Sequence, residues 1–331
     1  MKLMKTERPG WEKDRKILVK AIEAPDPRYG TSPENRSLEQ MIKFGIIIID
    51  KQAGPTSHEI TAWVKKLLNL DRAGHGGTLD PNVTGVLPIC LEDSTKIVQA
   101  LLLSGKQYIT IMRTHKAVKE KTIKDTLTEF EGEIFQRPPV RASVKRRLRK
   151  RYIYSINYIE GDGRNWLFKV TSQSGTYIRK LCYDVGEVIG TGAHMQELRR
   201  IRSGPFTEDE SVTLFDLAEA LDERDSNGKI EPLRKMIRPV EHGLKLIPKV
   251  WIRDSAVEAI CNGAQLAAPG VLKLESGIGH NDMLAIMTQK EELVALMQAV
   301  MTDAEALHSD RGVVAKPIRV IMPRGTYPKM W

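Results

Sequence analysis

Residues 74–88 read GHGGTLDPNVTGVLP, a glycine-rich stretch in which Asp80 is followed directly by Pro81. The stretch is too irregular for any helix or strand, so we predict an ordered loop at the edge of a cleft. An Asp-Pro pair by itself commonly starts a turn, and this leaves a purely structural role open for Asp80. A functional role requires side chains from other parts of the chain beside this loop.

The chain before the loop predicts a strand and a helix. Residues 44–49 form a short apolar run with the length of a buried strand. Residues 54–57, Gly-Pro-Thr-Ser, predict a turn, and Thr56 or Ser57 can cap a helix over residues 58–68. The apolar residues of this segment recur at the spacing of an amphipathic helix that lies on a sheet.

The chain after the loop predicts strands and helices in mixed order. Strand-like runs occupy residues 107–112, 151–159, 166–171 and 176–178, and helical patterns cover residues 178–189 and 195–200. This mixture indicates an α+β fold. From about residue 250, a helix over 255–262, a Pro-Gly turn and short strands predict a small appended domain, whereas the polar, proline-containing residues 1–40 predict an extended arm.

A second segment supplies candidate partners for Asp80. Tyr177 and Arg179 are two residues apart, a spacing that would place both on one face of a strand. An arginine beside a carboxylate would hold it ionised and oriented, which an aspartate needs in order to attack an electrophilic carbon. Tyr108, two residues after Lys106, is suited to stacking on a base. Taken singly, each aromatic residue is more often a core residue.

The charge of the chain indicates a polyanionic partner. Lysine and arginine total 51 against 42 acidic residues, a formal net charge of +9. Residues 141–151, RASVKRRLRKR, hold seven basic residues and no acid, and Pro138 and Pro139 precede them. The proline pair predicts that this basic segment projects as a loop that can follow a phosphate backbone. A solvated helix or loop face is the alternative.

The sequence argues against several classes of protein. Cys90, Cys182 and Cys261 are far apart and lie among apolar residues, which predicts buried thiols rather than disulfides or a zinc site. No apolar run reaches the roughly 18 residues that span a bilayer. Residues 1–20 lack a secretory signal, so we expect a cytoplasmic protein. The phosphate-binding glycine patterns of nucleotide-dependent enzymes are absent from the sequence.

Several of these segments together resemble one family. Residues 74–81 and 84–88 resemble the motif that carries the nucleophilic aspartate of pseudouridine synthases of the TruB and dyskerin type. The other motifs of this family resemble residues 50–58, 106–108, 175–186 and 198–204. The resemblance implies a pseudouridine synthase fold, with a mixed, mostly antiparallel sheet, flanking helices and a central cleft. It also implies isomerisation of uridine in RNA after base flipping, with no cofactor and no metal.

The resemblance implies a role for each matching residue. Four would be catalytic: Asp80 as the nucleophile, Arg179 as its ion-pair partner, Tyr108 as the stacking platform and Tyr177 as an active-site tyrosine. Six would form the substrate-binding site: His75, Lys51, Leu198, Lys106, Arg146 and Arg147, with Lys106 as a lysine that supports the site from behind. Among these, His75 would occupy the space that the base vacates, and Leu198 would form an apolar wall. Whether Asp80 attacks the ribose or the base stays open.

The arm, the basic segment and the end of the chain resemble the archaeal and eukaryotic dyskerin branch, and the lack of a lysine-rich tail favours an archaeal member. Residues 253–271 and 312–328 resemble a PUA domain. The implied organisation is an extension over residues 1–40 packed on the PUA domain, a catalytic domain over 41–247 and the PUA domain over 248–331. RNA contacts of the PUA domain are expected from Gly263, Ala264, Arg253 and Tyr327.

Members of this branch are catalytic subunits of H/ACA guide ribonucleoproteins. The implied partners are a guide RNA, a target rRNA, tRNA and the small protein subunits of the particle, one of which would contact the basic segment. A catalytically silent RNA-binding scaffold is the alternative, because basic segments and a PUA domain suffice to bind RNA. Stand-alone and guide-directed modification would use the same site, so the sequence does not separate them.

Overall fold

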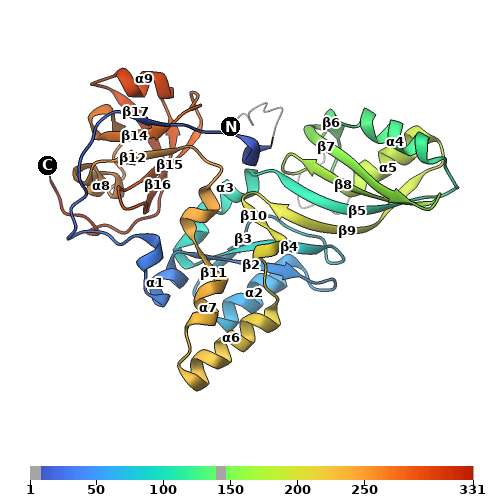
Figure 1. Ribbon diagram of the computed structural model, residues 1–331, viewed down its shortest axis with the longest axis horizontal. Coiled ribbons are helices and arrows are strands. Elements are labelled where there is room, and N and C mark those ends of the chain that lie inside the picture. The colour runs from blue at the N-terminus through green and yellow to red at the C-terminus, as the bar shows by residue number, and fades with distance from the viewer. Residues whose placement is uncertain (1–8, 139–146, 331) are drawn as a thin grey trace.

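The computed structural model describes residues 9–138 and 147–330 and contains two β-sheets with helices on their faces (Figure 1). The larger sheet has ten strands, all from residues 45–239. The smaller sheet has seven strands, one from the start of the chain and six from residues 249–320. The predicted α+β fold is therefore confirmed.

The larger sheet is mixed and mostly antiparallel. Its strands in spatial order are β11 (Ile237–Pro239), β2 (Gly45–Lys51), β4 (Thr84–Leu91), β9 (Ala193–Ser203), β5 (Lys106–Thr114), β8 (Asn165–Ser172), β7 (Arg149–Gly161) and β6 (Gly132–Gln136). Two short strands extend it, since β10 (Phe206–Thr207) pairs with β9 and β3 (Ala73–His75) pairs with β4. Strands β4 and β9 are parallel, which brings the start of β4 beside the middle of β9.

Two groups of helices cover this sheet (Figure 1). One group packs with β2 and β4 and consists of α1 (Leu38–Lys43), α2 (Ser57–Leu67), α6 (Leu214–Asn227) and α7 (Glu231–Met236). The other packs with β5, β7 and β8 and consists of α4 (Glu120–Glu129) and α5 (Ile178–Ile189). Helix α3 (Val98–Leu103) packs in a further core, which includes residues of the smaller sheet.

The smaller sheet forms the C-terminal region. Its strands in spatial order are β1 (Ile17–Val19), β14 (Val271–Glu275), β12 (Lys249–Ile252), β15 (Met283–Met287), β16 (Leu293–Ala299), β17 (Val313–Val320) and β13 (Leu266–Ala267). Helices α8 (Asp254–Cys261) and α9 (Asp303–His308) pack against it. Most side chains of its core are apolar, as the short strands of this segment predict.

Most predicted elements are confirmed, with ends that differ by no more than two residues. They are the strands predicted over residues 44–49, 107–112, 151–159 and 166–171 and the helices predicted over 58–68, 178–189 and 255–262. The thiols of Cys90, Cys182 and Cys261 are buried and free, as predicted. Burial raises the pKa of each of these thiols to about 12.

Three local predictions are wrong. Residues 74–88 are not irregular throughout, because their ends belong to β3 and β4 and only residues 76–83 form the loop. Residues 195–200 lie in β9 rather than in a helix, and residues 176–178 lead into α5, which begins at Ile178, rather than forming a strand. Strand β9 pairs with β5 along its length, and such long-range pairing outweighs a local helical pattern.

Strand β2 is buried on both faces, which explains its continuous apolar run. Successive side chains of a strand point to opposite faces. Ile47 and Ile49 accordingly lie in the core with α2 and α6, whereas Ile46 and Ile48 lie in the core with α3. Strand β4, which follows the loop that carries Asp80, pairs with β2 and thus lies beside a strand that is held from both sides.

The core with α3 joins the two sheets. Its apolar side chains from the C-terminal region include Trp251, Leu293 and Leu296, which pack with residues of β2 and β4. Separating the sheets would expose these side chains to water. The contact therefore resists hinge motion between the catalytic sheet and the C-terminal region.

The N-terminal arm contacts both regions. Its strand β1 pairs with β14, and further along it the backbone N–H of Thr31 donates to Glu292 at 2.9 Å. At its other end, the Trp11 ring lies 4.5 Å from the guanidinium carbon of Arg202 in β9. Figure 1 shows the arm passing along the C-terminal region. Among the described residues, no helix combines the length and apolar content needed to cross a membrane.

The shared core predicts that the two regions unfold together. Leu293→Ala should lower the free energy of unfolding by about 2–5 kcal/mol, because it leaves a cavity where both sheets meet. Chemical denaturation followed by tryptophan fluorescence and circular dichroism should give one transition, shifted in the variant. Ile318→Ala, at a side chain that is 49% exposed on β17, is the matched control and should cost under about 0.5 kcal/mol. Two separate transitions, with only one affected, would contradict a shared core.

Candidate active site

Asp80 lies in the loop 76–83 and forms an ion pair with Arg179, from Nη2 to Oδ2. The two residues are 99 positions apart, and about half of each side chain is exposed, 54% for Asp80 and 52% for Arg179. The structure therefore brings the predicted pair together at a surface that a substrate can reach. Arg179 extends from the first turn of α5, however, and not from a strand shared with Tyr177.

The buried Ser57 fixes the residue before Asp80. Its hydroxyl donates to the Leu79 carbonyl at 3.0 Å and accepts from the Leu79 N–H at 2.8 Å. Ser57 stands at the first position of α2, where Thr56 caps the helix in a capping box with Glu59. The start of α2 therefore sets the backbone position from which Asp80 extends.

Lys51 fixes the residues after Asp80. Its side chain is fully buried, and its ammonium donates to the carbonyls of Gln52, Pro81 and Val83 at 2.8 to 2.9 Å. Burial lowers the pKa of Lys51, while the charge of Asp80 raises it. All three ammonium hydrogens are used. The structure therefore contradicts a direct substrate contact by Lys51 and gives it a supporting position under the loop.

Lys106 is buried as well. It is 5% exposed, and its ammonium donates to the carbonyls of Leu101 and Ser104 at 2.8 and 2.7 Å, at the C-terminal end of α3. A cation at a helix C-terminus is favourable, because the last carbonyl groups carry a partial negative charge. Burial holds the pKa of Lys106 well below its ordinary value. The side chain caps α3 instead of reaching toward the substrate.

Tyr108 and Leu198 come from the neighbouring strands β5 and β9. Both are partly buried, and both pack where the core with α2 and α6 adjoins the core with α4 and α5. His75, at the end of β3, contacts His58 edge to face, with ring centroids 5.0 Å apart. Burial lowers the pKa of His75, so its imidazole is neutral at pH 7. These three residues occupy neighbouring elements of the sheet around the loop 76–83.

Tyr177 is held through its backbone. Gln136, which is buried at the end of β6, accepts a hydrogen bond from the Tyr177 N–H at 2.9 Å and donates to its carbonyl at 3.1 Å. Tyr177 is the residue before α5, so this clamp sets where the helix of Arg179 begins. The sequence did not single out Gln136, because its partner lies 41 positions away.

The sequence also missed Arg200, which is 1% exposed and donates to the carbonyls of Gly77 and Val86. It is one of three arginines within residues 199–202. Strand alternation predicts that some of these point inward, but the helix predicted here concealed that alternation. The sequence feature that could have identified Arg200 is a basic residue at a strand position whose side chain points inward.

Only part of the basic segment lies in the described structure. Arg146 is outside the described residues, and Arg147 is exposed. At the end of the segment, Arg151 of β7 donates from Nε to the Gly175 carbonyl at 2.8 Å. The segment therefore returns to the sheet next to the turn that leads to Tyr177 and Arg179.

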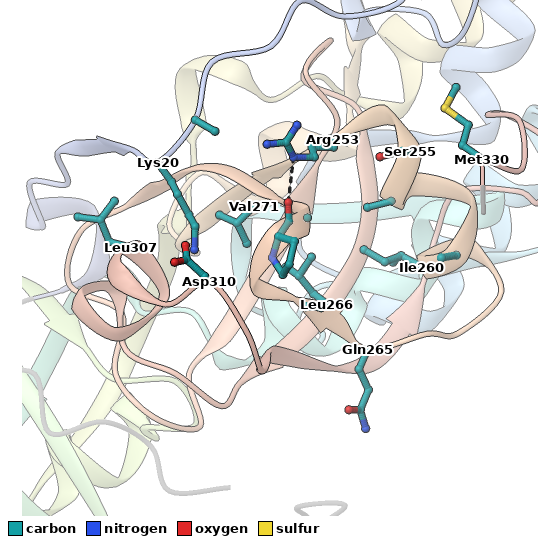
Figure 2. Close-up of a pocket in the computed structure, with 16 residues that line it drawn as sticks. Lys20, Arg253, Ser255, Ile260, Gln265, Leu266, Val271, Leu307, Asp310 and Met330 are labelled. Carbon is teal, nitrogen blue, oxygen red and sulfur yellow. Dashed lines mark hydrogen bonds between the residues drawn. The ribbon is translucent and has the colours of Figure 1, made fainter.

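A separate cavity of about 770 Å³ lies in the C-terminal region, between α8, the turn after it and the arm. Figure 2 shows Lys20, Arg253 and Asp310 at this cavity, with a hydrogen bond from Arg253 Nε to the Pro269 carbonyl at 2.9 Å. Arg253 also pairs with Glu23 of the arm. Gly263 and Ala264 are exposed just after α8, beside Gln265 of the cavity wall.

Tyr327 is not available to RNA. Its side chain is 1% exposed, and its hydroxyl donates to Glu292 at 2.9 Å. Burial raises the pKa of Tyr327. Because Glu292 also accepts from the arm residue Thr31, Tyr327 belongs to the connection between arm and C-terminal region, and the structure contradicts the predicted RNA contact of this side chain.

The described residues contain no group of three or more His, Cys, Asp or Glu side chains that could hold a metal ion. Fold and site together define a mixed α+β enzyme with an exposed aspartate–arginine pair on a loop of the larger sheet, followed by a small β-rich domain. The carboxylate is suited to nucleophilic chemistry at a site open to a large substrate.

Comparison with known protein families gives the class a name. The chain matches the N-terminal domain of the TruB family pseudouridylate synthases over residues 65–178 and the C-terminal domain of tRNA pseudouridylate synthase B over residues 179–245. A PUA domain matches residues 248–321, and a DKCLD (NUC011) domain matches residues 10–61.

Relatives of known sequence match over almost the whole chain. A probable tRNA pseudouridine synthase B of Methanopyrus kandleri is 54% identical, covering 99% of this chain and 97% of its own. The protein of the same description from Thermococcus kodakarensis is 53% identical, covering 96% and 94%. The chain belongs to the TruB family of pseudouridine synthases, isomerases that convert uridine to pseudouridine, and the resemblance seen in the motifs is confirmed.

Two solved structures are similar over their full length. The matching chain in a Cbf5-Nop10-Gar1 complex is 49% identical, with a TM-score of 0.94 and coverage of 98% of this chain and 99% of that one. The matching chain in an H/ACA RNP bound to a substrate RNA containing 2′-deoxyuridine is 48% identical, with a TM-score of 0.92 and coverage of 97% and 99%. The expected pseudouridine synthase fold with a PUA domain is therefore confirmed.

The position of Lys51 predicts a defect in turnover and not in RNA binding. Lys51→Met keeps the alkyl chain but leaves the Pro81 and Val83 carbonyls without donors, so the loop loses its fixed geometry. The single-turnover rate of pseudouridine formation should fall about tenfold or more, with RNA affinity unchanged. Both quantities can be measured on one labelled RNA. Weaker binding with an unchanged rate would instead indicate that Lys51 contacts the substrate.

Proposed function

We propose that this enzyme isomerises uridine within RNA and that Asp80 is its nucleophile. The observation that carries the proposal is the ion pair of Asp80 with Arg179 on an exposed loop that buried side chains hold from beneath. The Arg179 guanidinium keeps the Asp80 carboxylate oriented. The exposure of Asp80 leaves room for an approaching nucleotide. Such a carboxylate can act only on a uridine that has left its stack, so base flipping is part of the proposal.

The reaction needs no oxidant and no second reactant. The bond between ribose C1′ and uracil N1 breaks, the ring turns, and C1′ bonds to C5. The proton on C5 leaves and N1 gains one, so that atoms and charge balance. Asp80 attacks either the ribose or the base, and both routes suit its position. No step calls for a cofactor or a metal.

Three neighbours would hold the flipped base. Tyr108 offers an aromatic face at the start of β5, Leu198 offers an apolar side chain on the adjacent β9, and both are partly buried. Tyr177 would line the site from the residue before α5. His75 would occupy the space that the base leaves, as a neutral ring that does not repel or attract the phosphates.

Two kinds of RNA substrate fit the comparisons. The relatives from Methanopyrus kandleri and Thermococcus kodakarensis are described as acting on tRNA, and one structural neighbour belongs to an H/ACA RNP with a substrate RNA. We assign both activities to the same Asp80 site. The net charge of +9 supports binding to either RNA.

The partners would be a guide RNA and small protein subunits. Two similar structures contain Nop10 with Cbf5, and one also contains Gar1. The segment of residues 138–151 is the proposed contact for a small subunit, and the cavity at Arg253, with Gly263 and Ala264 beside it, is the proposed site for the guide RNA. A scaffold that only binds RNA would need the cavity but not the Asp80–Arg179 pair. The cytoplasm is the proposed compartment, since these RNAs are present there.

The nucleophile can be tested directly. Asp80→Asn keeps the size of the side chain and removes its charge, so pseudouridine formation should fall about a thousandfold or more. RNA affinity should stay within about threefold. Chemical mapping of pseudouridine in tRNA and in a guide-paired target, with and without guide RNA and small subunits, measures both activities.

The control is Asp125→Asn, at an exposed aspartate of α4 whose partner is the neighbouring Lys121. It should act at the wild-type rate. Wild-type activity in Asp80→Asn would defeat the nucleophilic assignment, whereas RNA binding without pseudouridine formation by the wild-type protein and its subunits would favour the scaffold. Wild-type turnover on a guide-paired target by the lone chain would show that the proposed subunits are dispensable.

The guide RNA site predicts a charge-dependent loss of affinity. Ala264→Glu places a carboxylate beside the cavity, where it should repel phosphates and weaken guide RNA binding about three- to tenfold at low salt. Ala264→Gln has the same size without the charge and should bind guide RNA normally. Filter binding at two salt concentrations distinguishes the variants. Equal affinities at low salt would place the guide RNA elsewhere.

A further inference from the structure

Arg200 connects three parts of the active site. From β9 its Nε donates to the Val86 carbonyl of β4 at 2.7 Å, and its Nη2 donates to the Gly77 carbonyl of the catalytic loop at 3.0 Å. Tyr108 lies directly opposite it in β5, and the Tyr108 side chain raises the pKa of Arg200 against the larger effect of burial. One planar group therefore touches the loop of Asp80, the strand after it and the tyrosine beside it.

A charged group is costly at this position. Arg200 is 1% exposed, and burial lowers its pKa as well as that of the nearby Lys106. Within residues 9–138 and 147–330, neither side chain forms an ion pair with an acid. An apolar side chain of similar size would avoid the desolvation of a cation. Stability therefore does not explain the guanidinium, and its hydrogen-bond partners point to another purpose.

The backbone around Arg200 leaves the guanidinium little freedom. Gly85 of β4 lies opposite it, and a Cβ atom at Gly85 would come within 2.2 Å of the Arg200 carbonyl oxygen. Gly85 also has a φ of +103°, which side chains rarely adopt. The close approach of β4 and β9 fixes the point from which the Arg200 side chain extends.

The two neighbouring arginines of β9 have different partners. Arg199 pairs with Asp50 at 2.9 Å and with Glu208 at 3.0 Å, on the other face of the strand. Arg202 stacks on Trp11 of the arm and donates to the Gly204 carbonyl at 3.2 Å. Neither contacts the loop 76–83. The connection to the catalytic loop therefore belongs to Arg200 within this basic run.

We infer that Arg200 is a positioning residue for the reaction: by binding the Tyr108 side chain and the Gly77 carbonyl with one rigid group, it sets the tyrosine ring relative to Asp80. The inference rests on the proposed function, in which Asp80 reacts with a uridine that stacks on Tyr108. It adds that Arg200 sets the distance between Asp80 and the Tyr108 ring. A guanidinium can hold several acceptors in one plane, which a lysine ammonium does not. A displacement of about 1 Å between reacting groups can cost about a hundredfold in rate.

Arg200→Lys should therefore slow the reaction without weakening RNA binding. The single-turnover rate on a tRNA transcript with tritium at C5 of uridine should fall about tenfold to a hundredfold, while the dissociation constant stays within about threefold. Arg202→Lys, the same substitution two positions along β9, is the matched control and should leave both unchanged. A wild-type rate in Arg200→Lys, or equal losses in rate and affinity, would overturn the inference.

A double variant tests whether Arg200 acts through Tyr108. Tyr108→Phe keeps the ring but removes the hydroxyl, so it should slow turnover with RNA affinity retained. Adding Arg200→Lys to Tyr108→Phe should then lower the rate by less than about threefold. Fully additive losses would show that the two side chains act independently and would refute the connection. Thermal unfolding of each variant identifies a loss that comes from misfolding.

If Arg200→Lys does not fold, the Tyr108→Phe variant alone tests the inference. A wild-type rate in Tyr108→Phe would overturn it. Asp80→Asn in the same assay separates this inference from the proposed function. Wild-type activity in Asp80→Asn defeats the proposed nucleophilic role of Asp80. An inactive Asp80→Asn together with a fully active Arg200→Lys defeats only the role of Arg200.

Discussion

Two buried cations bind backbone carbonyl groups on either side of Asp80, and the geometry of the active site depends on them. Arg200 binds Gly77 before the aspartate, and Lys51 binds Pro81 and Val83 after it. Carbonyl dipoles replace the acids that usually accompany buried cations, so that the positive charge stays under the loop. Asp80 and its partner Arg179 can remain exposed because the loop beneath them is held in this way.

Each supporting side chain comes from a different element of the fold. Lys51 ends β2, Ser57 begins α2, and Arg200 lies within β9. Strand β2 is in turn held by a core on each face, and one of these cores includes the C-terminal region. The position of the C-terminal cavity relative to Asp80 is therefore set by packed apolar side chains and by the arm. The distance between an RNA bound at the cavity and Asp80 would therefore be fixed.

The motif residues differ in what they do. Lys51 and Tyr327 were expected to touch RNA, yet both are buried and bound to protein groups. The pattern of residue types in a motif does not distinguish a side chain that contacts substrate from one that supports the backbone. Both kinds are polar, and only burial separates them.

The sequence alone determined the family, the α+β class, most strands and helices, and the pairing of Asp80 with Arg179. These follow from local periodicity and from motifs long enough to be specific. Tertiary structure decided that residues 195–200 form a strand and that Arg200 and Gln136 serve the site. The physical reason is that strand pairing and burial depend on partners far along the chain, and local sequence carries no record of which partner a side chain meets.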